Sequence, residues 1–150
     1  MGADLAGIPD AQSKPTFIVS AMKDSASDAT PLQQLQVVKG WVSPQGEKHV
    51  EVHNVAGDPD NGAGVNTEDG SRFGEGHASL CTVFKDESFD PSVPSYYYLR
   101  VVENPSPRWS LLDCLKMDEA DRPKVCADES LQVIREMAWT SPIWYTPETH

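Results

Sequence analysis

The sequence lacks long hydrophobic runs and is poor in basic residues. No stretch approaches the roughly 18 apolar residues that a membrane-spanning helix needs, so we expect no membrane span. Lysine and arginine number 12 against 23 aspartates and glutamates, which gives a formal net charge of -11. A chain this acidic does not attract a phosphate backbone through its overall charge, so nucleic acid is not an expected partner.

Basic residues are also missing from the N-terminal segment. Residues 1–12 contain no lysine or arginine, and Asp4, Pro9 and Asp10 interrupt every apolar stretch there. A secretory signal needs an early basic residue and then an apolar run. We therefore expect either that the protein stays in the cytosol or that Met1 is not the start of the natural polypeptide.

Cysteine is scarce, with only Cys81, Cys114 and Cys126 in the chain. None forms a C-x-x-C pair, which argues against a structural zinc site. Cys114 and Cys126 flank an irregular stretch, where they are either bridged or two separate thiols. In an oxidising compartment we expect the bridge, which contributes roughly 3 kcal/mol for a loop of this size. Cys81 lies within an apolar run and is expected to be a free, buried thiol.

The remaining composition suits a compact core. Hydrophobic residues make up 39% of the chain, with 4 Trp, 4 Tyr and 4 Phe, which argues against a disordered protein. A length of 150 residues allows one domain, and we expect residues 1–150 to form a single β-rich domain. The 12 prolines and 10 glycines indicate a loop-rich fold.

Alternation of period two dominates the chain and predicts strands. The expected strands cover residues 16–23, 32–42, 48–55, 78–84 and 96–103, with a further strand from about 134 to 145 broken near Ser141-Pro142. The turn residues 43–46 join the second and third strands into an antiparallel hairpin. Residues 86–94 are long enough for a crossover.

Two other segments complete the expected fold. Ser106 and Pro107 provide an N-cap and a first helical residue, followed by Trp109, Leu112 and Leu115 on one helix face. Residues 57–76 are a long loop rich in glycine and aspartate. The chain is therefore predicted to be mostly β, an antiparallel β-sandwich or barrel-like domain with one short helix.

Possible metal ligands occur in two places. His49, Glu51 and His53 share one face of a predicted strand, where two of them could hold a metal, although a solvated strand face is the simpler interpretation. Asp58 and Asp60, with two further oxygen donors downstream at Asn66 and Asp69, could bind calcium. The segment lacks the later ligands of an EF-hand loop, so a mobile acidic loop is preferred.

Other polar and aromatic residues provide weaker candidates. Glu103 and Glu136 could pair as general acid and base, but their strands are not known to be neighbours. Arg108 and Arg135 could anchor an anion, although ion pairs with nearby carboxylates explain them more simply. The aromatic residues are expected to pack mainly in the core rather than to form a sugar-stacking platform. These residues are Tyr96–Tyr98, Trp139, Trp144 and Tyr145. On an unbroken strand the two tryptophans would lie on opposite faces.

Several longer strings carry a family resemblance. They are QVVKGW at 36–41, LCTVF at 80–84, FDP at 89–91, YYLRVVENP at 97–105, RWS at 108–110 and AWTSPIWYTP at 138–147. In this order they resemble the C-terminal part of domain-of-unknown-function family 3604. The resemblance covers nearly the whole chain and is specific because long aromatic-containing strings recur in order.

The resemblance implies a large bacterial parent protein, periplasmic or secreted, that is distantly similar to the polymerase-and-histidinol-phosphatase-type metallohydrolases. It places this chain in the β-rich tail after a metal-binding barrel. No position here matches a ligand motif of that barrel, so the resemblance implies no catalytic residue and no cofactor in this chain. We expect a non-catalytic accessory domain that packs on the upstream barrel and forms a homodimer when isolated. The alternative is an independent module that binds carbohydrate or calcium.

Overall fold

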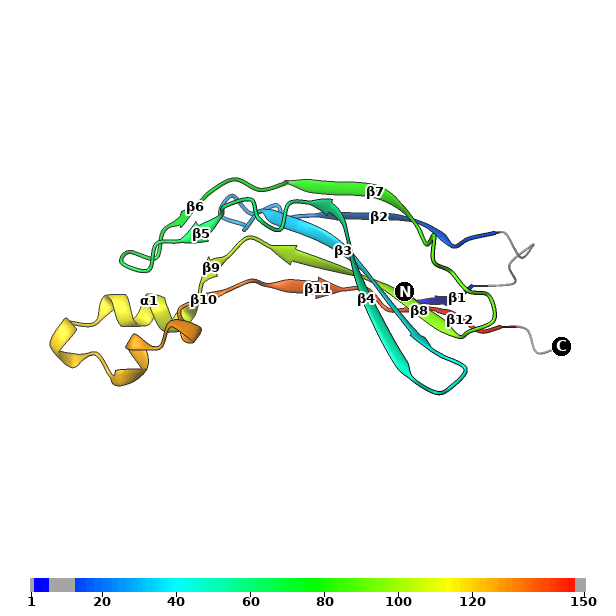
Figure 1. Ribbon diagram of the computed structural model, residues 1–150. Helices are drawn as coiled ribbons and strands as arrows, with labels where there is room; N and C mark the ends of the chain where they lie inside the picture. Colours follow the sequence, from blue (N-terminus) through cyan, green and yellow to red (C-terminus); the bar gives the residue numbers. More distant parts are fainter. Residues whose placement is uncertain (1, 6–12, 148–150) are drawn as a thin grey trace.

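The computed structural model describes residues 2–5 and 13–147, which form two stacked sheets with a small lobe at one end (Figure 1). The larger sheet has the strand order β1-β12-β8-β3-β4, and β11 also pairs with β8. Its strands are β1 (Ala3–Asp4), β3 (Leu32–Val42), β4 (Lys48–Gly57), β8 (Ser95–Glu103), β11 (Met137–Trp139) and β12 (Ile143–Tyr145). The smaller sheet pairs β2 (Thr16–Met22) with β7 (Ser79–Lys85).

The described strands form a sandwich-like fold rather than a closed barrel. The five long predicted strands are confirmed, and the turn after Val42 joins β3 to β4 as an antiparallel hairpin. The segment between β7 and β8 crosses from one sheet to the other, as its length predicted. One pairing departs from the antiparallel expectation, because β1 runs parallel to β12.

The loop predicted at residues 57–76 contains a short hairpin of β5 (Gly64–Val65) and β6 (Arg72–Phe73). Its tight turn needs Gly70, which has a φ of +74°. A Cβ at this position would lie 2.9 Å from the side chain of Leu112, so the turn also packs closely against the helix.

The end lobe contains an α-helix, the only one among the described residues, and three 3-10 turns. Its elements are β9 (Ser106–Pro107), α1 (Trp109–Lys116), η1 (Glu119–Asp121), η2 (Lys124–Ala127), η3 (Glu129–Leu131) and β10 (Val133–Ile134). The predicted helix start was wrong, because Ser106 and Pro107 pair with β10 as a strand and Arg108 occupies the N-cap position. Trp109 is 78% exposed, while Leu111 is the buried residue of the helix.

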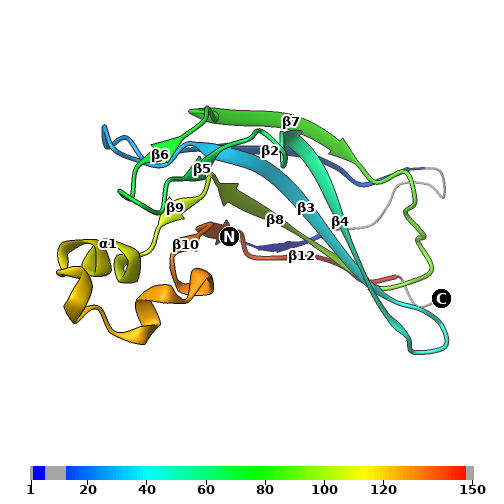
Figure 2. The same cartoon turned by 60° about the vertical axis from the view of Figure 1, so that its left-hand side comes forward.

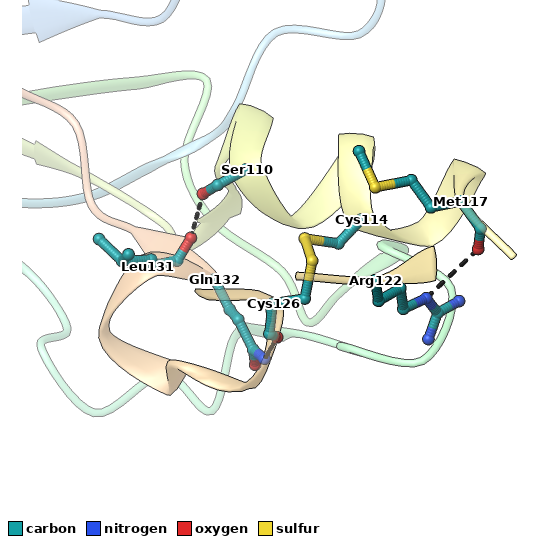
Figure 3. Close-up of a disulfide and its surroundings, with 7 residues drawn as sticks. All are labelled: Ser110, Cys114, Met117, Arg122, Cys126, Leu131 and Gln132. Atoms are coloured by element: carbon teal, nitrogen blue, oxygen red, sulfur yellow. Dashed lines mark hydrogen bonds between the residues drawn. A yellow bond between two sulfur atoms is a disulfide. The ribbon is translucent and has the colours of Figure 1, made fainter. Parts of the chain in front are cut away.

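A disulfide between Cys114 and Cys126 closes this lobe, as the sequence predicted for an oxidising compartment. Figure 3 shows that it joins α1 to η2. The hydroxyl of Ser110 donates a hydrogen bond to the carbonyl of Leu131, which ties the start of α1 to η3. A covalent bond and a hydrogen bond therefore join α1 to the 3-10 turns of the lobe.

The core lies between the two sheets, where alternate side chains of each strand point inward. It comprises Val19, Leu32, Leu35, Val37, Leu80, Tyr97 and Leu99. The residues between them point outward because side chains alternate along a strand. For this reason Cys81 is free but exposed, and its predicted burial was wrong. None of the helices in the described part of the chain is long and apolar enough to cross a membrane.

Candidate functional site

The larger sheet has a second face, here called the outer face, that points away from the β2–β7 layer (Figure 2). Tyr97 points inward and contacts the ring of Phe17, with 4.9 Å between ring centroids. Its neighbours Tyr96 and Tyr98 therefore point outward, where their rings stack with 6.3 Å between centroids. The indole of Trp144 extends this group, at 5.3 Å from the ring of Tyr96.

A one-residue shift in strand register brings Trp139 to the same face. In β11, Trp139 pairs with Arg100, whereas in β12 Trp144 pairs with Tyr96. Arg100 and Tyr96 share a face of β8, so the two tryptophans do as well. The break predicted near Ser141-Pro142 is confirmed, and the extra residue it accommodates reverses the alternation. The opposite faces expected for an unbroken strand therefore do not occur.

Gly40 makes room for the aromatic group. A Cβ at Gly40 would lie 2.3 Å from Cζ of Tyr96, so the tyrosine ring lies directly over the glycine backbone. Beside the rings runs a polar row, in which Gln36 accepts a hydrogen bond from Nε of Arg100 at 2.6 Å and donates one to Oδ1 of Asn54 at 2.8 Å. These bonds orient the polar side chains next to the aromatic surface.

Much of this outer face is exposed. Trp139 and Trp144 are 59% and 50% exposed, and Met137 is 42% exposed. Val50 and Val52 of β4 also lie on this face and are 61% and 46% exposed. The expectation of core packing therefore holds for Tyr97 and Tyr145, which are buried, and is wrong for the two tryptophans. A monomeric protein rarely leaves so many large apolar side chains on one face uncovered.

The three residues of the predicted histidine face are on the inner side of β4. His53 packs against the ring of Phe84 at 5.0 Å between centroids, and His49 stacks on Trp41 at the same distance. Glu51 lies 3.4 Å from Nε2 of His53. The solvated face expected here is confirmed in part, because β7 packs over this side while the side chains of His49, Glu51 and His53 remain 39%, 46% and 32% exposed. The valines of β4 face solvent on the other side.

The predicted calcium donors are split between two turns. Asp58 accepts a hydrogen bond from the amide of Asp60, and Asn66 and Asp69 each accept one from an amide two residues further on. These bonds stabilise the local backbone of the turns. Within residues 2–5 and 13–147, no three His, Cys, Asp or Glu side chains are grouped closely enough to hold one metal ion.

Glu103 and Glu136 are neighbours, which the sequence did not show. The amide of Glu103 donates a hydrogen bond to the carbonyl of Glu136 at 3.0 Å. Burial raises the pKa of Glu103, and the charge of Glu136 raises it further. In the described part of the chain, neither arginine forms the ion pair expected for it. Nε of Arg108 donates to the carbonyl of Val133, and Asp113 pairs with Lys116.

One buried polar network was missed in the sequence. Nζ of Lys39 lies 2.6 Å from Asp86, and the hydroxyl of Tyr97 donates to the same carboxylate at 2.7 Å. Ser88 donates to Asp86 through both its amide and its hydroxyl. The only sequence signal is a lysine within the strand segment VVKGWV, because the aspartate lies in a loop far along the chain.

The charged groups and the phenol of this network are paired with one another. Burial tends to raise the pKa of Asp86, but the hydrogen bonds from Lys39, Tyr97 and Ser88 outweigh it and lower the pKa below the ordinary value. Burial and the Asp86 carboxylate raise the pKa of Tyr97 well above its usual range. A neutral tyrosine and an ion pair, joined through Asp86 and Ser88, hold the crossover segment to β3.

A protein-family model matches nearly the whole chain. The model described as protein of unknown function, DUF3604, matches residues 1–147. The chain belongs to this family. Comparison with curated proteins gave no match, and neither did comparison with solved structures. The DUF3604 match spans both sheets and the end lobe, so the outer face and the disulfide lobe lie within the family domain.

Proposed function

We propose that this chain is a non-catalytic accessory β domain of a larger DUF3604 protein, packing on an upstream hydrolase-like barrel through its outer face. The observation that carries the proposal is the group of exposed aromatic and apolar side chains on one face of the larger sheet. Within residues 2–5 and 13–147, the layer of strands that covers this sheet is β2–β7, on its other side. A sheet that is apolar on both faces needs a second covering layer.

Further observations favour packing over catalysis. Among the described residues, the buried charges are Lys39 and Asp86, and their side chains bond to each other, to Ser88 and to Tyr97. On the outer face the rings of Tyr96 and Tyr98 stack on one another, and the ring of Tyr96 is held against the backbone of Gly40. Rigid aromatic side chains are enriched at the centres of protein interfaces because they bury much area at little entropic cost.

The coding sequence and a binding experiment together test this proposal. The reading frame immediately upstream of Met1 should encode a barrel domain. That region, produced separately, should form a complex with this chain in size-exclusion chromatography with light scattering. Trp139→Asp and Trp144→Asp should each weaken the complex at least about tenfold, because each introduces a buried charge.

Ile18→Asp is the matched control. Ile18 is 82% exposed on the β2–β7 layer, on the opposite side of the molecule, so this variant should bind normally. A reading frame without a barrel, or equal binding by the Trp139 and Ile18 variants, would contradict the proposal.

A second candidate function is carbohydrate binding by the same face. It is favoured by the polar row of Gln36, Asn54 and Arg100, which lies beside the stacked tyrosines. Sugars bind to aromatic rings through their C–H faces and to neighbouring polar side chains through their hydroxyls. A rise in melting temperature with a neutral oligosaccharide, absent in Trp144→Ala, would support this function over domain packing.

A further inference from the structure

A separate groove of about 630 Å³ lies between the end lobe, the β5–β6 hairpin and the turn before β3. Two arginines from distant parts of the chain line it, Arg72 from β6 and Arg108 from the start of α1. The exposed indole of Trp109 forms part of its wall, with the acidic residues Asp28 and Glu136 also among the lining residues. Neither the groove nor this combination of residues belongs to the outer face.

Both guanidinium groups are positioned by neutral oxygens. Arg72 donates to the hydroxyl of Thr30 at 2.8 Å and to the carbonyl of Asp28 at 2.6 Å. Arg108 donates through Nε to the carbonyl of Val133 at 3.4 Å. Among the ion pairs of the described residues, none involves either arginine, although the chain carries a net charge of -11.

Both arginines therefore have N–H donors left for a ligand. A guanidinium has five N–H donors, and the hydrogen bonds above use two on Arg72 and one on Arg108. The planar fork of arginine suits carboxylate and phosphate groups, which it can bind with two parallel hydrogen bonds. Two such forks in one groove favour an oxyanion.

The other lining groups restrict the kind of anion. The flat face of Trp109 can stack on a ring, and the hydroxyl of Ser106 can bond to a ring hydroxyl. Glu136 accepts hydrogen bonds from hydroxyls but repels additional negative charge. Arg72 and Glu136 both influence the pKa of the half-buried Glu103, with opposite signs, so both charges lie near that carboxyl group. The groove thus combines anion, hydroxyl and ring recognition.

We propose that this groove binds a hydroxylated ring compound carrying one oxyanion group, the chemistry shared by uronic acids and sugar phosphates. The arginines hold the oxyanion, Glu136 and Ser106 bond to hydroxyls, and the ring stacks on Trp109. Because Glu136 and the acidic chain oppose a second negative charge, the singly charged uronate binds more tightly than the phosphate ester.

Titration of the whole chain with four probes tests this inference. Tryptophan fluorescence or calorimetry at low salt should show saturable binding of glucuronate and weaker binding of glucose 6-phosphate. Glucose, which lacks the anion, and acetate, which lacks the ring, should each bind at least about tenfold more weakly than glucuronate. Affinity for glucuronate should fall as salt screens the arginines.

Two arginine variants with the same charge change provide the decisive comparison. Arg108→Gln should weaken glucuronate binding about tenfold or more, because charge-assisted hydrogen bonds are lost. Arg122→Gln, in the same lobe, should bind like the unmodified chain, since Arg122 bonds to the carbonyl of Met117 outside the groove. Trp109→Ala should also weaken binding several-fold.

The melting temperature of each variant verifies that it is folded. Arg72 helps to hold the turn before β3, so Arg72→Lys, which keeps the charge but loses the fork, is used in place of its removal. Absence of saturable binding to both anionic sugars would overturn the proposal. Glucose binding as tightly as glucuronate, or equal losses in Arg108→Gln and Arg122→Gln, would overturn it too.

Discussion

Lys39 and Asp86 are buried charges, and each one needs the other as its partner. Their side chains are 5% and 1% exposed, and they are 2.6 Å apart. Forming a buried ion pair adds little net stability because both charges lose their water. Removing one partner, however, leaves the other charge buried without compensation, which is costly.

Asp86→Asn is therefore expected to lower the free energy of unfolding by about 3–5 kcal/mol at pH 7. Urea unfolding followed by circular dichroism measures this change. Asp60→Asn, at an exposed turn, should change stability far less. Equal losses in the two variants would show that the buried pair has no special role.

The same pair makes stability depend on pH. The pKa of Asp86 in the folded protein lies below its ordinary value of 3.8, so the carboxylate is favoured by folding. Its contribution is fully present above that value and is lost as the pH falls through the folded pKa. The stability difference between the unmodified chain and Asp86→Asn should thus be constant from neutral pH down to about pH 5 and shrink below pH 3.8. A difference that grew on acidification would contradict this assignment.

Gly40 and Tyr96 form a second dependent pair. Gly40→Ala places a methyl group in the tyrosine ring and should cost about 1–3 kcal/mol. Because the clash requires the ring, Gly40→Ala should cost much less in a Tyr96→Ala background. A double-mutant cycle of urea unfolding measures the coupling, and simple additivity would show that the ring does not lie over the glycine.

At the scale of elements, the end lobe differs from the sheets in what holds it. The sheets share a continuous apolar core, whereas α1 buries only Leu111. Its attachment to η2 depends on the Cys114–Cys126 bond across 12 residues of chain. The lobe is therefore expected to unfold separately from the sandwich when the bond is removed.

The double variant Cys114→Ser with Cys126→Ser tests this separation. It should destabilise the lobe by roughly 3 kcal/mol, since the open chain gains loop entropy. Hydrogen exchange of α1 amides should accelerate, while amides of β3 and β8 stay protected. Cys81→Ser is the matched control and should leave both regions unchanged. Equal acceleration in β3 would show that the lobe and the sandwich unfold as one unit.

At the scale of the whole molecule, the uncovered outer face predicts self-association of the isolated chain. Two copies can cover their outer faces by two-fold pairing, which uses the same surface from each. The net charge of -11 opposes this only weakly at physiological salt, where screening acts over about 8 Å.

Light scattering across a tenfold concentration range should therefore show a dimer that dissociates on dilution. The double variant Trp139→Asp with Trp144→Asp should remain a monomer of 16.5 kDa, whereas Ile18→Asp should still dimerise. A strictly monomeric unmodified chain would remove the main support for a covered outer face.

Local patterns in the sequence were enough to predict the main elements. Alternation of apolar and polar residues located β3 and β8 almost to the residue, and the turn chemistry located the hairpin after β3. These features depend on backbone geometry and on neighbours within a few residues. The Cys114–Cys126 bridge was predictable for the same reason, because its partners are close in the chain.

Only the tertiary structure decided which face of each strand is buried and which residues far apart in the sequence come together. Alternation shows that two sets of side chains lie on opposite sides of a strand, but only the partner layer determines which side is buried. For this reason the valines of β4 are exposed, whereas His53 packs half-buried against Phe84. The register shift that unites Trp139 with Trp144 arises from pairing with β8. Arg72 and Arg108 line the same groove because the fold brings β6 near the start of α1. No local pattern in the sequence encodes this proximity.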